Sequence, residues 1–74
     1  PDADPYGTVE DVREQWREYE LDLREGVKAT MEGGWVWLQP MEGFVRVAVE
    51  ADTRARAREL LEAGKKAINP LPVA

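Results

Sequence analysis

The sequence has 74 residues and a formal net charge of −5, with 43% hydrophobic and 34% charged residues. This length allows one domain, and the hydrophobic content is too high for a disordered tail. The absence of Cys, His and Ser excludes disulfides, Cys/His zinc sites and the usual catalytic nucleophiles and bases. The longest apolar run, Trp35 to Leu38, is far shorter than the roughly 20 residues that span a bilayer.

The N-terminal third predicts a flexible segment at residues 1–7 followed by a helix. Prolines, aspartates and a glycine fill residues 1–7, and Thr8 is typical of a helix N-cap. Apolar residues then recur at helical spacing, which predicts one buried stripe made of Val9, Val12, Trp16, Tyr19 and Leu23.

The end of this helix has two interpretations. Gly26 stops it, or it continues to Gly33-Gly34 at a cost of about 1 kcal/mol for an internal glycine. The helix-forming residues between these glycines favour the longer helix. The alternation of Val27, Ala29 and Met31 instead fits an extra strand, turned back by the sequence EGG.

Two strands and a second helix follow. Residues 35–39 and 44–50 predict a β-hairpin, and Asp52 or Thr53 predicts the cap of a helix that ends at Asn69-Pro70. The apolar side of this helix comprises Ala57, Leu60, Leu61, Gly64 and Ile68. The sequence therefore predicts one small α+β domain over residues 8–69, helix–β-hairpin–helix (αββα) or αβββα with the extra strand, and a C-terminal tail at residues 70–74.

The length of the hairpin loop decides which strand faces lie together. A four-residue loop PMEG suits Pro40 at its first position and Gly43 at its last, whereas a three-residue loop MEG leaves Pro40 in the closing pair, where it has no N–H to donate. The even loop places Val36 and Leu38 with Val45, Val47 and Val49 on the core face. It also places Trp37 opposite Arg46, where a cation–π contact is expected.

The other strand face predicts the surface that meets a partner. It carries Trp35, Trp37, Phe44 and Arg46, and Trp and Arg are the residues that dominate interface hot spots. Three acidic positions, Glu14, Glu18 and Asp22, predict a secondary surface for a basic partner. Three occupants remain open for the aromatic face: another part of the same chain, a second copy in a homodimer, or a different protein.

Nucleic acid binding is the alternative function. Basic residues of the second helix, Arg54, Arg56, Arg58, Lys65 and Lys66, supply candidate phosphate contacts, and the aromatic face supplies base stacking. With a strand at residues 26–31, the element order resembles that of double-stranded-RNA-binding domains. The resemblance is one of order alone: the last helix begins DTRARAREL instead of with a Lys-rich start, and the pI of about 4.6 opposes polyanion binding.

The sequence predicts a non-enzymatic cytoplasmic protein that needs no cofactor or metal and works by protein–protein contact, with a homodimer as the leading assembly. The stretch GFVRVAVEADTRARA resembles strand-then-helix segments of small antitoxins and phage accessory proteins. This resemblance implies an accessory or regulatory role in a bacterium, phage or mobile element.

Overall fold

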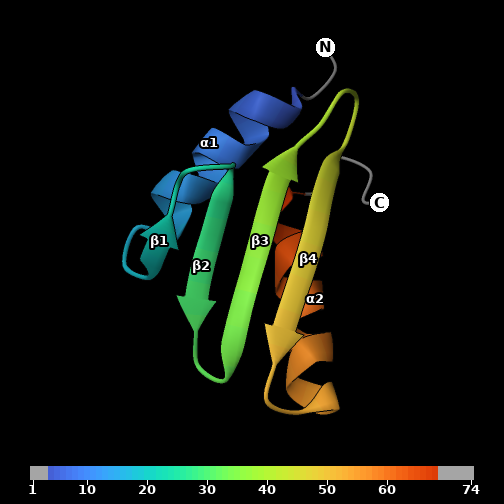
Figure 1. Ribbon diagram of the computed structural model, residues 1–74. Helices are drawn as coiled ribbons and strands as arrows, with labels where there is room; N and C mark the ends of the chain where they lie inside the picture. The colour runs from blue at the N-terminus through green and yellow to red at the C-terminus, as the bar shows by residue number, and fades with distance from the viewer. Residues whose placement is uncertain (1–3, 69–74) are drawn as a thin grey trace.

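The computed structural model describes residues 4–68 as two helices and one four-stranded antiparallel sheet (Figure 1). The elements in chain order are α1 (Pro5–Gln15), β1 (Glu20–Asp22), β2 (Val27–Met31), β3 (Gly34–Pro40), β4 (Val45–Ala51) and α2 (Arg54–Ile68). The strands lie in the sheet in their order along the chain. The predicted α+β class is confirmed, but the αββα arrangement is wrong, because the sheet has two more strands than the hairpin.

Both helices pack on the same face of the sheet. Helix α2 lies against β3 and β4, whereas α1 lies against β2 and β3 (Figure 1). Alternate strand residues point toward the helices and are buried with them, forming the core of Val9, Val12, Val27, Val36, Leu38, Val45, Val47, Leu60 and Ile68. Because only this face is covered by helices, its strand residues are mostly apolar, whereas the opposite face mixes charged, polar and aromatic residues.

Helix α1 begins earlier and ends earlier than the sequence predicts. Asp4, not Thr8, is the N-cap: its carboxylate accepts from the backbone N–H of Tyr6 at 3.3 Å, and Pro5 occupies the first helical position. Residues 5–7 are therefore helical instead of part of a flexible segment. Residues 1–3 and 69–74 lie outside the described residues, and with them the predicted helix end at Asn69-Pro70 and the tail.

The prediction that this helix continues to Gly33-Gly34 is wrong. It ends at Gln15, and the chain returns as β1 and β2, so the alternative of a strand at residues 27–31 is confirmed. Val27 and Ala29 are fully buried in the sheet, whereas Tyr19 and Leu23 of the predicted helical stripe are 45% and 43% exposed. A helix would place Val27 and Ala29 on opposite sides, so that only one of them could face the core, whereas the strand buries both on the same face.

The predicted even parity of the β3–β4 loop is confirmed, and with it the core face. The loop comprises four residues, Met41 to Phe44, and Pro40 pairs with Val45. This register differs by two residues from the predicted one, so Trp37 lies opposite Ala48 instead of Arg46. The backbone N–H of Met41 donates to the Phe44 carbonyl at 2.8 Å, so Met41 and Phe44 form a hydrogen-bonded pair that closes the loop. Because hydrogen-bonded and non-hydrogen-bonded pairs alternate, the next pair, Pro40 with Val45, is non-hydrogen-bonded and requires no N–H from the proline.

Helix α2 starts where the sequence predicts. The hydroxyl of Thr53 accepts from the backbone N–H of Arg56 at 3.1 Å, which identifies Thr53 as the cap. Gly64 allows this helix to approach the sheet closely, since a methyl group in its place would lie 2.9 Å from Val47 and 3.1 Å from Val36. This contact fixes α2 over β3 and β4.

Candidate interaction surface

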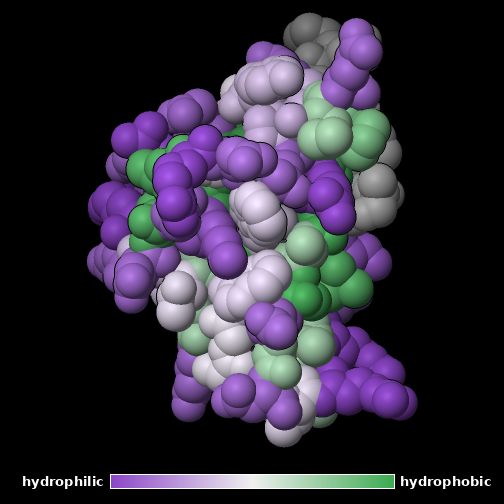
Figure 2. Space-filling model, viewed as in Figure 1, coloured by the Kyte–Doolittle hydropathy of each residue, from purple (hydrophilic) through white to green (hydrophobic). Residues whose placement is uncertain are grey.

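The face of the sheet that points away from both helices carries the two tryptophans. We call it the open face; within residues 4–68, no helix lies on it (Figure 1). Its residues are Glu20 and Asp22 of β1, Lys28 and Thr30 of β2, Trp35, Trp37 and Gln39 of β3, and Arg46, Ala48 and Glu50 of β4. Figure 2, seen from this side, shows a pale band of residues of intermediate hydropathy, with hydrophilic residues gathered on its left and hydrophobic ones adjoining it on the right. Trp35 and Trp37 are half-buried instead of enclosed in a second core layer.

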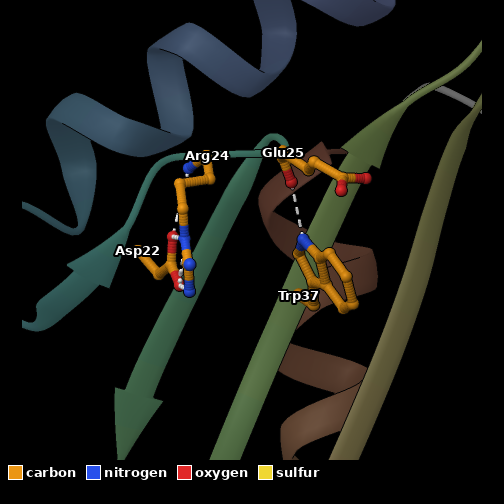
Figure 3. A network of polar contacts seen from close by, with 4 residues as sticks. All are labelled: Asp22, Arg24, Glu25 and Trp37. Carbon is orange, nitrogen blue, oxygen red and sulfur yellow. Dashed lines mark hydrogen bonds and ion pairs between the residues drawn. The ribbon is translucent and has the colours of Figure 1, made fainter.

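Hydrogen bonds from both indole N–H groups hold the tryptophan rings in place. Trp37 donates to the backbone carbonyl of Glu25 at 2.6 Å (Figure 3), and Trp35 donates to the Glu50 carboxylate at 3.1 Å. The two rings meet edge to face, with centroids 6.4 Å apart. Because their polar atoms are satisfied, the rings present rigid apolar surface that costs little entropy to bury on binding.

Lys28 supplies the cation of this cluster. Its ammonium nitrogen lies 4.3 Å from the Trp35 ring centroid and 5.3 Å from that of Trp37. The prediction that Arg46 contacts Trp37 in this way is wrong, because the register places Arg46 opposite Gln39, whose side-chain oxygen accepts from it at 3.4 Å. Lys28 was missed because its role requires residues 27–31 to be a strand.

A hollow of about 180 Å³ adjoins the tryptophans and is lined by Asp22, Arg24, Glu25, Lys28 and Trp37. The guanidinium of Arg24 lies 2.6 Å from the Asp22 carboxylate, and its backbone N–H also donates to that carboxylate (Figure 3). These hydrogen bonds lower the pKa of Asp22 to about 2. Asp22 is therefore neutralised by its neighbour instead of free to attract a basic partner.

The other predicted contact residues fall on different parts of the fold. Arg46 is exposed on the open face, whereas Phe44 lies in the β3–β4 loop outside β4. Of the predicted acidic surface, Glu14 is on α1 and pairs with Arg17, and Glu18 is in the following turn. The three acidic residues belong to three separate segments and do not share one helix face.

The basic residues of the nucleic acid alternative all lie on α2, on the opposite side of the sheet from the tryptophans. Arg56 donates to the Glu32 carbonyl at 2.7 Å and to Glu59 at 3.0 Å, and Lys65 pairs with Glu62. The structure thus separates the candidate phosphate contacts from the candidate stacking residues. A single surface that combines both is not formed.

Residues 4–68 provide neither a metal site nor a membrane-spanning helix. They contain no group of three or more potential metal-ligating side chains placed to hold an ion. Across the same residues, neither helix has the length and apolar character that crossing a membrane requires.

Comparison with known proteins finds partial similarity to one kind of enzyme. An alignment of 51 residues that covers 66% of the chain is 41% identical to part of the phosphoglucosamine mutase of Methanococcus aeolicus. An alignment of 43 residues that covers 55% of the chain is 40% identical to part of a probable phosphoglucosamine mutase of Methanopyrus kandleri. The chain spans 11% and 10% of these relatives' lengths. No protein-family model and no solved structure matches it.

Proposed function

We propose that this chain is a non-catalytic cytoplasmic module that binds a protein partner through its open face. The observation that carries the proposal is the pair of half-exposed, hydrogen-bonded tryptophans on a sheet face that no helix of residues 4–68 covers. An aromatic pair with fixed rings and a nearby cation has the composition of an interface hot spot. Charges of both signs surround the aromatic pair, including Lys28, Arg46 and Glu50, and favour a partner with charged groups of both signs around an apolar centre.

The absence of Cys, His and Ser from the chain supports the non-catalytic part of this proposal.

Site-specific photo-crosslinking tests the open face. A benzophenone amino acid at Thr30, which is exposed beside Trp35, is expected to give a discrete protein adduct in the source cells. The same amino acid at Glu62, exposed on α2, is the matched control and is expected to give none. Trp35→Ala combined with Trp37→Ala should abolish the Thr30 adduct. Adducts from Glu62 with none from Thr30 would overturn the proposal.

The similarity to phosphoglucosamine mutases favours a second candidate function, as a non-catalytic part of a protein that handles phosphorylated glucosamine. NMR titration of the chain with phosphorylated glucosamine tests this candidate directly. Saturable shifts of backbone amides at millimolar ligand are the expected result, and unchanged spectra would count against it.

A further inference from the structure

Strand β4 is a long sheet edge that pairs on one side only. It forms the right-hand edge of the sheet in Figure 1 and has seven residues, whereas the opposite edge strand, β1, has three. Proteins commonly protect such edges with prolines, bulges or short strands. The seven consecutive pairs between β3 and β4 leave no bulge, and β4 contains neither proline nor glycine. The long edge therefore keeps the geometry that another strand needs.

The hydrogen-bond alternation identifies which backbone groups face outward. In an antiparallel ladder, every second residue directs its N–H and C=O to the same neighbour. The bond from the Asp52 N–H to the Gly33 carbonyl, 2.8 Å long, fixes this alternation at the end of β4. Arg46, Ala48 and Glu50 consequently bond to β3. The backbone groups of the residues between them point away from the sheet, and nothing in residues 4–68 pairs with them.

The side chains of β4 are arranged symmetrically about Ala48. On the open face, Arg46 and Glu50 stand two residues before and two residues after it, with opposite charges, and both are exposed. On the helix face, Val47 and Val49 flank it in the same way. Figure 2 shows hydrophobic surface along this side of the molecule, beside β4.

We propose that β4 pairs antiparallel with β4 of a second copy, centred on Ala48, to form an eight-stranded sheet. In this register Arg46 faces the partner's Glu50, and Glu50 faces the partner's Arg46, so both charges of each copy are matched. Val47 faces the partner's Val49, and their outward backbone groups make the hydrogen-bonded pairs. The two-fold axis stands perpendicular to the sheet, so both copies keep their helices on one side.

Neighbouring registers lack this complementarity. Centring the pair on Arg46 or on Glu50 places like charges opposite each other, which is unfavourable. Centring it on Val47 or Val49 places a charged side chain opposite Ala48 and leaves the charges unmatched. Sliding one strand by one residue along the other centres the pair between two residues, and helix-face residues of one copy then lie opposite open-face residues of the other. Ala48 is the centre at which charge, hydrophobic and backbone patterns agree.

This inference concerns the β4 edge, whereas the proposed partner site is centred on Trp35 and Trp37; Arg46 and Glu50 border both. Pairing through β4 leaves Trp35 and Trp37 exposed and brings two open faces into one continuous sheet surface. Trp35→Ala with Trp37→Ala is therefore the variant that removes the partner site without altering the β4 edge, and the substitutions at Arg46 and Glu50 report on self-association.

Sedimentation velocity across a concentration series tests the pairing. The wild-type chain is expected to shift from 8.4 kDa to twice that mass as its concentration rises. Arg46→Glu and Glu50→Arg each place like charges opposite each other and are expected to weaken the dimer about tenfold. The double variant, Arg46→Glu with Glu50→Arg, restores both pairs and is expected to recover wild-type dimerisation.

Circular dichroism confirms that each variant is folded, and Arg17→Glu, whose side chain is 67% exposed in the turn after α1, is the matched charge-reversal control. A wild-type chain that stays monomeric at millimolar concentration would overturn the proposal. So would a double variant that fails to recover. Dissociation by Trp35→Ala with Trp37→Ala, but not by the charge reversals, would move the self-contact to the open face and also overturn it.

Discussion

Replacing Gly26 by alanine puts a methyl group into the backbone of the neighbouring strand. Gly26 precedes β2 with a φ of 79°, a left-handed conformation that favours glycine. A Cβ atom built there overlaps the carbonyl oxygen of Leu38 and lies 3.1 Å from the Cα of Gln39. Gly43 in the β3–β4 loop provides the matched control, because its φ is 85° but a Cβ atom there meets nothing within 4 Å.

The comparison separates conformational strain from steric overlap. A left-handed alanine costs about 1–2 kcal/mol of stability, partly offset by the lower entropy of the unfolded chain, so Gly43→Ala should cost about 1 kcal/mol. Gly26→Ala carries the same strain and must also displace backbone atoms of β3, which adds about 1–3 kcal/mol. The expected total of about 2–4 kcal/mol is a large share of the roughly 4–11 kcal/mol typical of a domain this size.

Urea denaturation followed by tryptophan fluorescence measures both variants against the wild type. We expect Gly26→Ala to lower the free energy of unfolding by at least about 1 kcal/mol more than Gly43→Ala, with a melting temperature lower by several degrees. Equal losses in the two variants would refute the reasoning, because they would show that a methyl group fits between Gly26 and β3.

Three further predictions concern the cap, the ion pair and the core. Asp4→Ala should lower the free energy of unfolding by about 1 kcal/mol, whereas Thr8→Ala, inside the helix, should not lower it; urea denaturation distinguishes them. Arg24→Gln should raise the pKa of Asp22 from about 2 toward 3.8 in a carboxyl NMR titration. Because folding lowers the pKa of Asp22, the Asp22–Arg24 pair stabilises the folded state above about pH 4, and this contribution disappears as the pH falls toward 2. Leu38→Ala, at a fully buried position, should cost about 2–5 kcal/mol in the same denaturation assay.

The hairpin shows how far local sequence reasoning reaches. Alternation in the two strands assigned Val36 and Leu38 to the core face, and the positions of Pro40 and Gly43 favoured an even loop; both predictions are confirmed. The register was wrong by two residues because registers that differ by two share the same faces. The observed register is the one in which the backbone N–H of Met41 donates to the Phe44 carbonyl, and the pattern of residue types does not distinguish it from the predicted register.

Residues 16–31 show where local reasoning fails. The stretch from Val27 to Met31 contains good helix formers, and its strand conformation depends on pairing with β3, which follows it in the sequence. Strand β1 is only three residues long, too short to show alternation, and the sequence pattern missed it. The same error assigned Glu14, Glu18 and Asp22 to one helix surface and left Lys28 out of the aromatic cluster.

The sequence by itself determined the α+β class, the core face of the hairpin, the start of α2 at Asp52 or Thr53 and the shared face of Trp35 and Trp37. These features follow from side-chain alternation, loop parity and capping, which act over a few residues. The tertiary structure decided the number of strands, the cation beside the tryptophans and the separation of the basic helix from the aromatic face. Those features depend on contacts between distant segments, because pairing with β3 overrides helix propensity in β2 and both helices cover the same side of the sheet.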